Sequence, residues 1–166
     1  MPQRLAADFS ELGIELKTLP VGADGRPRES TFVCYVPLAS LRETDWRRSR
    51  VALKLGRVLF VPIESEPKLC FAQRRVGSAF LWSPSAQQER VLCDDYAAIA
   101  SRVSDGHLEM LDARVGRALQ LRPKAASGRV NVRYSDGEGV PLLTRPRGFY
   151  LRASFTAEIV QQALLG

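Results

Sequence analysis

Three charged residues near the start of the chain have the types and the spacing of a metal-assisted hydrolytic site. The alternation from Gly13 to Leu19 is that of a β-strand, which puts Glu15 and Lys17 side by side on one face. Asp8, a short turn upstream, is close enough to fold back against that face. Carboxylates are hard ligands that suit magnesium, the carbonyl of Leu16 can complete the metal shell, and a neighbouring lysine can orient or help to deprotonate an attacking water.

These residue types predict hydrolysis of a phosphodiester. The alternative is a solvent-facing strand whose charges form a weak surface pair. Taken alone, so short a pattern favours the surface pair, and the rest of the chain has to decide between the two interpretations.

Basic residues suited to phosphate are spread along the chain. Lys and Arg outnumber Asp and Glu by 24 to 18, for a net charge of +6, which is compatible with nucleic acid or an anionic membrane. Because proline interrupts regular pairing, we expect Arg122-Pro123-Lys124 and Arg145-Pro146-Arg147 to present their charges from strand ends or loops. An ordinary charged surface explains any one cluster equally well. Next to them, Phe149 fits a core or a binding role, and Tyr150 favours binding.

The composition excludes several other kinds of site. The chain has three cysteines without paired spacing and a single histidine, which argues against a disulfide framework, a cysteine zinc site and a histidine metal cluster. No apolar run approaches the length that spans a membrane, and the first residues lack an apolar signal core. We therefore expect a cytoplasmic protein without a membrane association.

The elements that must position the candidate residues alternate between strands and helices. Strands are expected over residues 13–19, 30–37, 57–63, 74–82, 118–122 and 148–152, and helices over residues 46–55, 84–106 and 155–165. The short connection predicts that the first two strands are antiparallel neighbours, and residues 125–140 are typical of a loop or loose hairpin. With 166 residues, the chain is predicted to form one α/β domain with a mixed sheet and flanking helices.

Six blocks of the sequence resemble the MutH family of DNA mismatch-repair endonucleases. They cover residues 11–20, 31–34, 72–78, 81–84, 121–126 and 146–151, and the similarity runs from about Ala6 to the C-terminus. The resemblance implies a restriction-endonuclease-like fold, in which a mixed central β-sheet is flanked by α-helices. It also implies a Mg²⁺-dependent nick in double-stranded DNA, made on the unmethylated strand at hemimethylated GATC and stimulated by the MutL ATPase.

The resemblance assigns roles to the first group of charged residues. Asp8 and Glu15 would bind the metal together with the carbonyl of Leu16, and Lys17 would serve the nucleophilic water. These roles agree with the chemistry that the residue types suggest by themselves.

The resemblance also assigns residues outside the first strand. Glu29 and Lys54 fall in matching blocks and would support the cleft. Arg122, Lys124 and Tyr150 match the DNA-contacting strand and loop of the family, and Tyr150 would sense adenine methylation.

The sequence departs from the family pattern before Asp8. Members carry an additional N-terminal helical segment there, which supplies one lobe of the cleft and another acid, whereas Met1 stands seven residues before Asp8. We therefore expect residues 1–166 to form a single, monomeric MutH-like domain without that lobe. Two alternatives stay open: a non-catalytic remnant that binds DNA or MutL, and a related restriction endonuclease that cuts both strands at GATC.

Overall fold

The computed structural model describes Phe9 and residues 11–42, 45–108, 111, 115–124, 132–135 and 138–165. Its strands are β1 (Glu15–Val21), β2 (Thr31–Val36), β3 (Val58–Glu64), β4 (Phe80–Trp82), β5 (Leu119–Pro123), β6 (Val132–Ser135), β7 (Pro141–Thr144) and β8 (Arg147–Leu151). Its α-helices are α1 (Arg50–Leu55), α2 (Ala86–Ser104) and α3 (Ala153–Leu165). Short 3₁₀ turns cover Leu38–Arg42, Trp46–Arg48 and Phe71–Gln73. The predicted mixed α/β architecture is confirmed.

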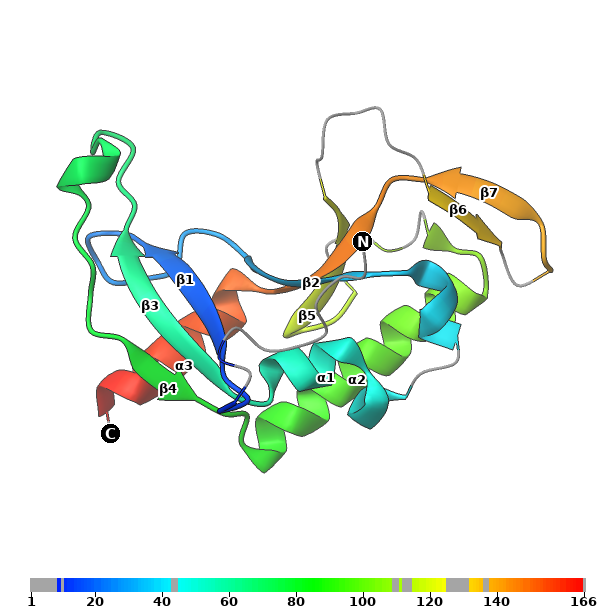
Figure 1. Cartoon of the computed structure of the whole chain (residues 1–166), viewed down its shortest axis with the longest axis horizontal. Helices are drawn as coiled ribbons and strands as arrows, with labels where there is room; N and C mark the ends of the chain where they lie inside the picture. The colour runs from blue at the N-terminus through cyan, green and yellow to red at the C-terminus, as the bar shows by residue number, and fades with distance from the viewer. Residues whose placement is uncertain are drawn as a thin grey trace.

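The first sheet has the strand order β1-β3-β4, and its strand β1 contains the catalytic candidates Glu15 and Lys17 (Figure 1). Strand β1 runs parallel to β3, with Glu15 opposite Val58, and β4 is antiparallel to β3. The continuous apolar run of β3 takes the centre, as expected for a strand covered on both faces. Along β1, Glu15 and Leu19 are buried while Thr18 is exposed, so the predicted alternation is confirmed.

The second sheet is antiparallel and has the order β2-β8-β5. The expected pairing of the first two strands is therefore wrong. Their connection closes a turn of its own, in which Gly22 N–H donates to Arg26 O and Arg28 N–H donates to Pro20 O, and Gly25 adopts a φ of +72°. Because this turn uses the hydrogen bonds at the end of β1, the chain leaves the first sheet and enters the second. Strands β6 and β7 form a separate hairpin. Strand β6 lies within the predicted loop, and β7 follows it.

Helix α2 runs below the second sheet in the view of Figure 1 and packs against its buried face. Its buried residues Leu92, Ile99 and Val103 belong to the same core as Phe149 and Leu151. The terminal helix α3 contacts β4 of the first sheet. None of the helices in the described ranges is long and apolar enough to cross a membrane.

The N-terminal boundary of α2 differs from the prediction. Ser85, rather than Ser83, caps the helix: its hydroxyl accepts from Gln88 N–H at 3.2 Å, and the Gln88 side chain accepts from Ser85 N–H at 3.0 Å. This reciprocal capping box requires Glu or Gln three residues after the cap. Gln88 meets that requirement for Ser85, and Ala86 cannot meet it for Ser83.

Two other predicted elements are shorter in the structure. The helix expected over residues 46–55 is divided at Ser49, which is extended and caps α1 by accepting from Ala52 N–H at 3.0 Å. The strand expected over residues 74–82 is reduced to β4 and an isolated antiparallel bridge between Val76 and Ile63, next to which Gly77 N–H donates to Pro62 O at 2.9 Å. The division at Ser49 matters for the site, because it sets which face of α1 is buried.

Candidate active site and nucleic-acid interface

Glu15 lies at the centre of a buried cluster of charges. Its Oε1 accepts from Lys17 Nζ at 2.8 Å, and its Oε2 accepts from Lys54 Nζ at 2.5 Å. Only 5% of the Glu15 side chain is exposed, against 15% for Lys17 and 9% for Lys54. The interpretation of β1 as a strand with a weak solvent-facing pair is therefore wrong. Removing ions from water is costly unless they are paired, so this geometry needs all three groups.

Two separate elements deliver the lysines to Glu15. The pleat of β1 places Lys17 on the same face, where its Nζ also donates to Val33 O of β2 at 3.3 Å. Helix α1 buries Val51, Lys54 and Leu55, which follow the spacing of one helix face. The sequence signal for Lys54 is a lysine at a helix position that an apolar residue would be expected to occupy. The signal can be recognised only when the start of the helix after Ser49 is known.

The cluster has an excess of positive charge. Two ammonium groups face one carboxylate, and Arg50 lies close enough to act on the same region electrostatically. The neighbouring Cys34 is not a thiolate nucleophile, because burial raises its pKa to about 11 although Arg50 and the two lysines oppose that shift. The cluster is therefore suited to binding an anion such as phosphate rather than to thiol chemistry.

The Glu15 carboxylate is the oxygen donor that this cluster would offer to a hard divalent cation. Both of its oxygens accept from lysine ammonium groups, so a bound cation would have to take the place of a lysine at one of them. Mg²⁺ in proteins commonly binds through one or two carboxylates, with water and substrate phosphates completing its shell. Within the described ranges, no group of three or more His, Cys, Asp or Glu residues gathers. Asp8, the second predicted carboxylate ligand, lies outside the described residues.

A cavity of about 430 Å³ opens beside this cluster. Its lining includes Lys17, Glu29, Thr31 and Tyr150, so the structure brings together residues predicted for catalysis, support and DNA contact. Thr31, which the sequence analysis did not single out, is buried, and its hydroxyl has no hydrogen-bond partner within the described residues. A buried donor without a partner is costly, which makes Thr31 a candidate substrate contact.

The predicted DNA-binding residues lie on one face of the second sheet. Tyr150 of β8 is opposite Phe32 of β2, and Arg122 of β5 is opposite Gly148, two residues from Tyr150. The Arg122 guanidinium carbon lies 5.6 Å from the centroid of the Tyr150 ring, and the Phe32 ring meets Tyr150 edge-on at 5.3 Å. The phenol is therefore held between a cation and a second ring.

The opposite face of this sheet is core. Phe149 is fully buried and stacks on Tyr96 of α2, with the ring centroids 5.6 Å apart. Successive residues of a strand face opposite sides, so Phe149 in the core requires Tyr150 to face outward. The structure thus gives Phe149 a packing role and leaves Tyr150, which is half-buried, on the surface that contains the cavity.

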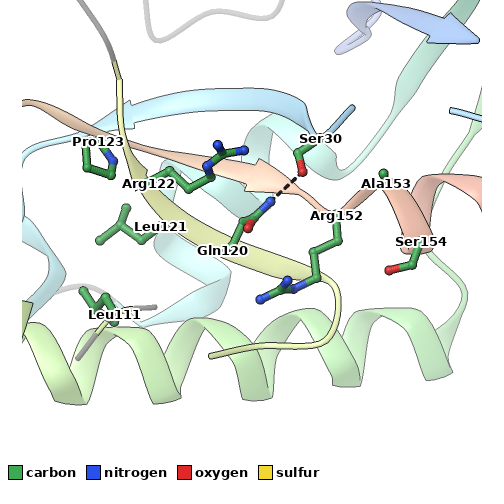
Figure 2. Close-up of a pocket in the computed structure, with 9 residues that line it drawn as sticks. All are labelled: Ser30, Leu111, Gln120, Leu121, Arg122, Pro123, Arg152, Ala153 and Ser154. Atoms are coloured by element: carbon green, nitrogen blue, oxygen red, sulfur yellow. Dashed lines mark hydrogen bonds between the residues drawn. The ribbon is translucent and has the colours of Figure 1, made fainter. Parts of the chain in front are cut away.

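A second cavity, of about 580 Å³, lies at the free edge of β5 (Figure 2). In its middle, Gln120 Nε2 donates to Ser30 Oγ at 2.6 Å. Arg122 and Arg152 line it, and no carboxylate is among the lining residues that the structure describes. Because Ser30 lines both cavities, this basic edge continues the surface on which Tyr150 lies.

Comparisons with known proteins agree with these features. Residues 3–95 match the family described as DNA mismatch repair enzyme MutH. The chain is 48% identical to the DNA mismatch repair protein MutH of Serratia proteamaculans over 92% of its own length and 67% of that protein. It is 45% identical to the protein of the same name from Vibrio parahaemolyticus, over 92% of the chain and 68% of the relative.

A third similar protein, from an Enterobacter species, is 43% identical over 95% of the chain and 69% of the relative. The chain thus spans about two thirds of the length of these relatives. Its mixed first sheet, its antiparallel second sheet and the helices that flank them are consistent with a restriction-endonuclease-like fold. The chain therefore belongs to the MutH family of DNA mismatch repair enzymes.

Proposed function

We propose that this protein is a Mg²⁺-dependent DNA endonuclease of mismatch repair, which nicks the unmethylated strand of double-stranded DNA at hemimethylated GATC sites and is activated by MutL. The observation that carries the proposal is the position of Lys17. Its ammonium is hydrogen-bonded to the buried Glu15 carboxylate, and its side chain lines the cavity shared with Tyr150. One residue thus joins the buried charges to the surface suited to DNA.

In this proposal, Glu15, the carbonyl of Leu16 and Asp8 hold Mg²⁺. When bound, Mg²⁺ would neutralise charge that develops on the scissile phosphate and lower the pKa of a coordinated water. Lys54 compensates part of the Glu15 charge, and its 2.5 Å hydrogen bond fixes the orientation of the carboxylate.

Lys17 acts on the water and the phosphate. Hydrogen bonds to Glu15 and to the carbonyl of Val33 restrict its ammonium to a small region at the cavity wall. A positively charged donor fixed there orients a water for in-line attack and stabilises the negative charge of the phosphorane-like transition state. Thr31 and Glu29, which line the same cavity, can contact the substrate backbone and the water network beside it.

DNA recognition uses the face that contains Tyr150. Arg122 and Lys124 supply cations for backbone phosphates. Tyr150 is restrained between Arg122 and Phe32, so its ring cannot move freely to accommodate an additional methyl group on adenine. A restrained ring at this position is suited to distinguishing methylated from unmethylated strands.

Plasmid nicking tests the proposal. Supercoiled DNA with a single hemimethylated GATC site is incubated with the protein in Mg²⁺, with and without MutL and ATP. Open-circular product cut on the unmethylated strand is expected, with more product when MutL and ATP are present. Linear product from unmethylated DNA would identify a restriction endonuclease. Retention of DNA or MutL without any cut would identify a non-catalytic binding protein.

A further inference from the structure

A β-bulge in β2 brings two aromatic residues to the same face of the second sheet. Phe32 is opposite Tyr150 and Cys34 is opposite Phe149, so β2 uses one residue more than β8 between these pairs. Residues three apart on a regular strand face opposite sides, and the additional residue reverses that relationship. Tyr35 therefore joins Phe32 on the face of Tyr150, and the two β2 rings meet edge-on at 5.3 Å.

The room for this pair comes from Gly148 on the neighbouring strand. A Cβ atom at this position would lie 2.7 Å from Cε2 of Phe32 and 3.1 Å from the carbonyl oxygen of Cys34. Only a residue without a side chain allows the Phe32 ring to lie this close to β8. The ring pair is thus built into the sheet by a bulge on one strand and a glycine on the other.

The pair contacts Lys124. The ammonium nitrogen lies 3.7 Å from the centroid of Phe32 and 4.4 Å from that of Tyr35. The backbone of Lys124 is also fixed, because its N–H donates to Pro146 O at 2.9 Å. The backbone of Lys124 and the ammonium at the end of its flexible side chain are therefore both held in place.

Aromatic rings carry no net charge, so their contact with Lys124 differs in its effect from a salt bridge. A carboxylate partner would neutralise the ammonium, whereas aromatic faces attract it and leave its full charge available for an anion. Within the described residues, Lys124 forms no salt bridge. A free lysine has to lose considerable conformational entropy when it pairs with a phosphate, and a lysine already held by rings loses less.

We propose that Tyr35 is a positioning residue for DNA binding: together with Phe32 it holds the Lys124 ammonium in place for a backbone phosphate of the duplex. The inference rests on the proposed function, because it needs the chain to bind DNA. Tyr35 acts through Lys124, and the ring rather than the hydroxyl does the positioning.

The test measures binding of a hemimethylated GATC duplex in Ca²⁺ by fluorescence anisotropy at several salt concentrations. Tyr35→Val keeps a residue that suits an edge strand and removes the ring, and Tyr35→Leu serves as a second ring-free variant. Either is expected to bind about three- to tenfold more weakly, which corresponds to the usual cost of losing one cation–π contact and the restraint that it provides. Tyr35→Phe, the matched control, is expected to bind like the unaltered protein.

Lys124→Gln provides the specific comparison. In this background, Tyr35→Val is expected to have no further effect, because the group that it positions is already absent. An equal loss in both backgrounds, or full binding by Tyr35→Val, would overturn the inference. If the unaltered protein binds no DNA, the proposed function fails. If it binds DNA and Tyr35→Val binds equally well, only the positioning role of Tyr35 fails.

A second measurement needs no DNA. The rings should shift the ¹H resonances of the Lys124 ε-methylene upfield, and this shift should be lost in Tyr35→Val and retained in Tyr35→Phe. Unfolding by heat shows that each variant is folded. Unshifted Lys124 resonances in the unaltered protein would overturn the inference, whatever the binding results.

Discussion

Lys54 of helix α1 donates a 2.5 Å hydrogen bond to Glu15 of strand β1, 39 residues earlier in the chain. Lys17 holds the other oxygen of the same carboxylate at 2.8 Å. Glu15 is therefore a buried anion between two cations that come from different elements. Each of the three charges depends on the others, and this dependence can be tested by substitution.

Replacing Lys54 should affect stability as well as nicking. Lys54→Met removes a hydrogen bond to a buried carboxylate, so we expect the free energy of unfolding to fall by about 1.5–3 kcal/mol, as measured in urea. Lys68→Met is the matched control, because Lys68 is exposed on the connection between β3 and β4. Equal stability of the two variants would contradict a structural role for the Lys54–Glu15 pair.

Glu15→Ala and Lys17→Ala should separate cleavage from binding. Each variant is expected to lose Mg²⁺-dependent nicking of a GATC plasmid by at least about 10²-fold, the usual effect of removing one group that stabilises transition-state charge. Binding of the same DNA in Ca²⁺ should persist, because the face with Arg122 and Tyr150 is unchanged. If both variants nick at the unaltered rate, the assignment of the metal site is wrong.

Tyr150 substitutions should change selectivity more than affinity. For Tyr150→Ala, we expect the ratio of nicking rates on hemimethylated and fully methylated GATC to fall by about fivefold or more, the usual scale of one base contact. Tyr150→Phe, which keeps the ring between Arg122 and Phe32, should show whether the hydroxyl contributes. Equal losses on every methylation state would rule out the proposed sensing role.

Gly148→Ala should disturb the surface without touching the buried charges. The added Cβ would lie 2.7 Å from Phe32 and close to a backbone oxygen, so the ring has to move. We expect a loss of about 1–3 kcal/mol in unfolding free energy and weaker DNA binding. Gly56→Ala, where the nearest atom to the new Cβ is 3.4 Å away, is the control and should change neither quantity appreciably.

Cys34 predicts a specific dependence of stability on pH. Burial raises the thiol pKa from 9.0 to about 11, so the unfolded chain releases this proton before the folded chain does. As pH rises from about 9 towards 11, the unfolded state binds fewer protons, and Cys34 lowers the free energy of unfolding. Urea unfolding of Cys34→Ala should show a smaller decline over this range than the unaltered protein. If both proteins lost stability equally over this range, groups other than Cys34 would account for the decline.

Thiol labelling gives an independent check on Cys34. At pH 8 the exposed Cys70 should react readily with an aromatic disulfide reagent, whereas Cys34 should react only after unfolding, because it is buried and its pKa is raised. Fast reaction of Cys34 in the folded protein would contradict its burial beneath the charged cluster.

The local sequence was sufficient to predict the features that depend on a single strand or helix. The alternation around Glu15 and Lys17 placed both side chains on one face, because the pleat of a strand has a period of two residues whatever it pairs with. The apolar run of β3 and the helical spacing of α2 were also predictable, because each pattern lies within a single element. Strand pairing was not, and the partner of β1 proved to be β3 rather than β2.

Tertiary structure alone decided which distant residues meet. Lys54 reaches Glu15 only because Ser49 starts α1 with that face inward, and Tyr35 reaches Lys124 only because β2 carries a bulge opposite β8. Side-chain direction within an element follows from backbone geometry a few residues long. Register, bulges and the contact between elements follow from packing of the whole core, so residues far apart in the sequence settle them together.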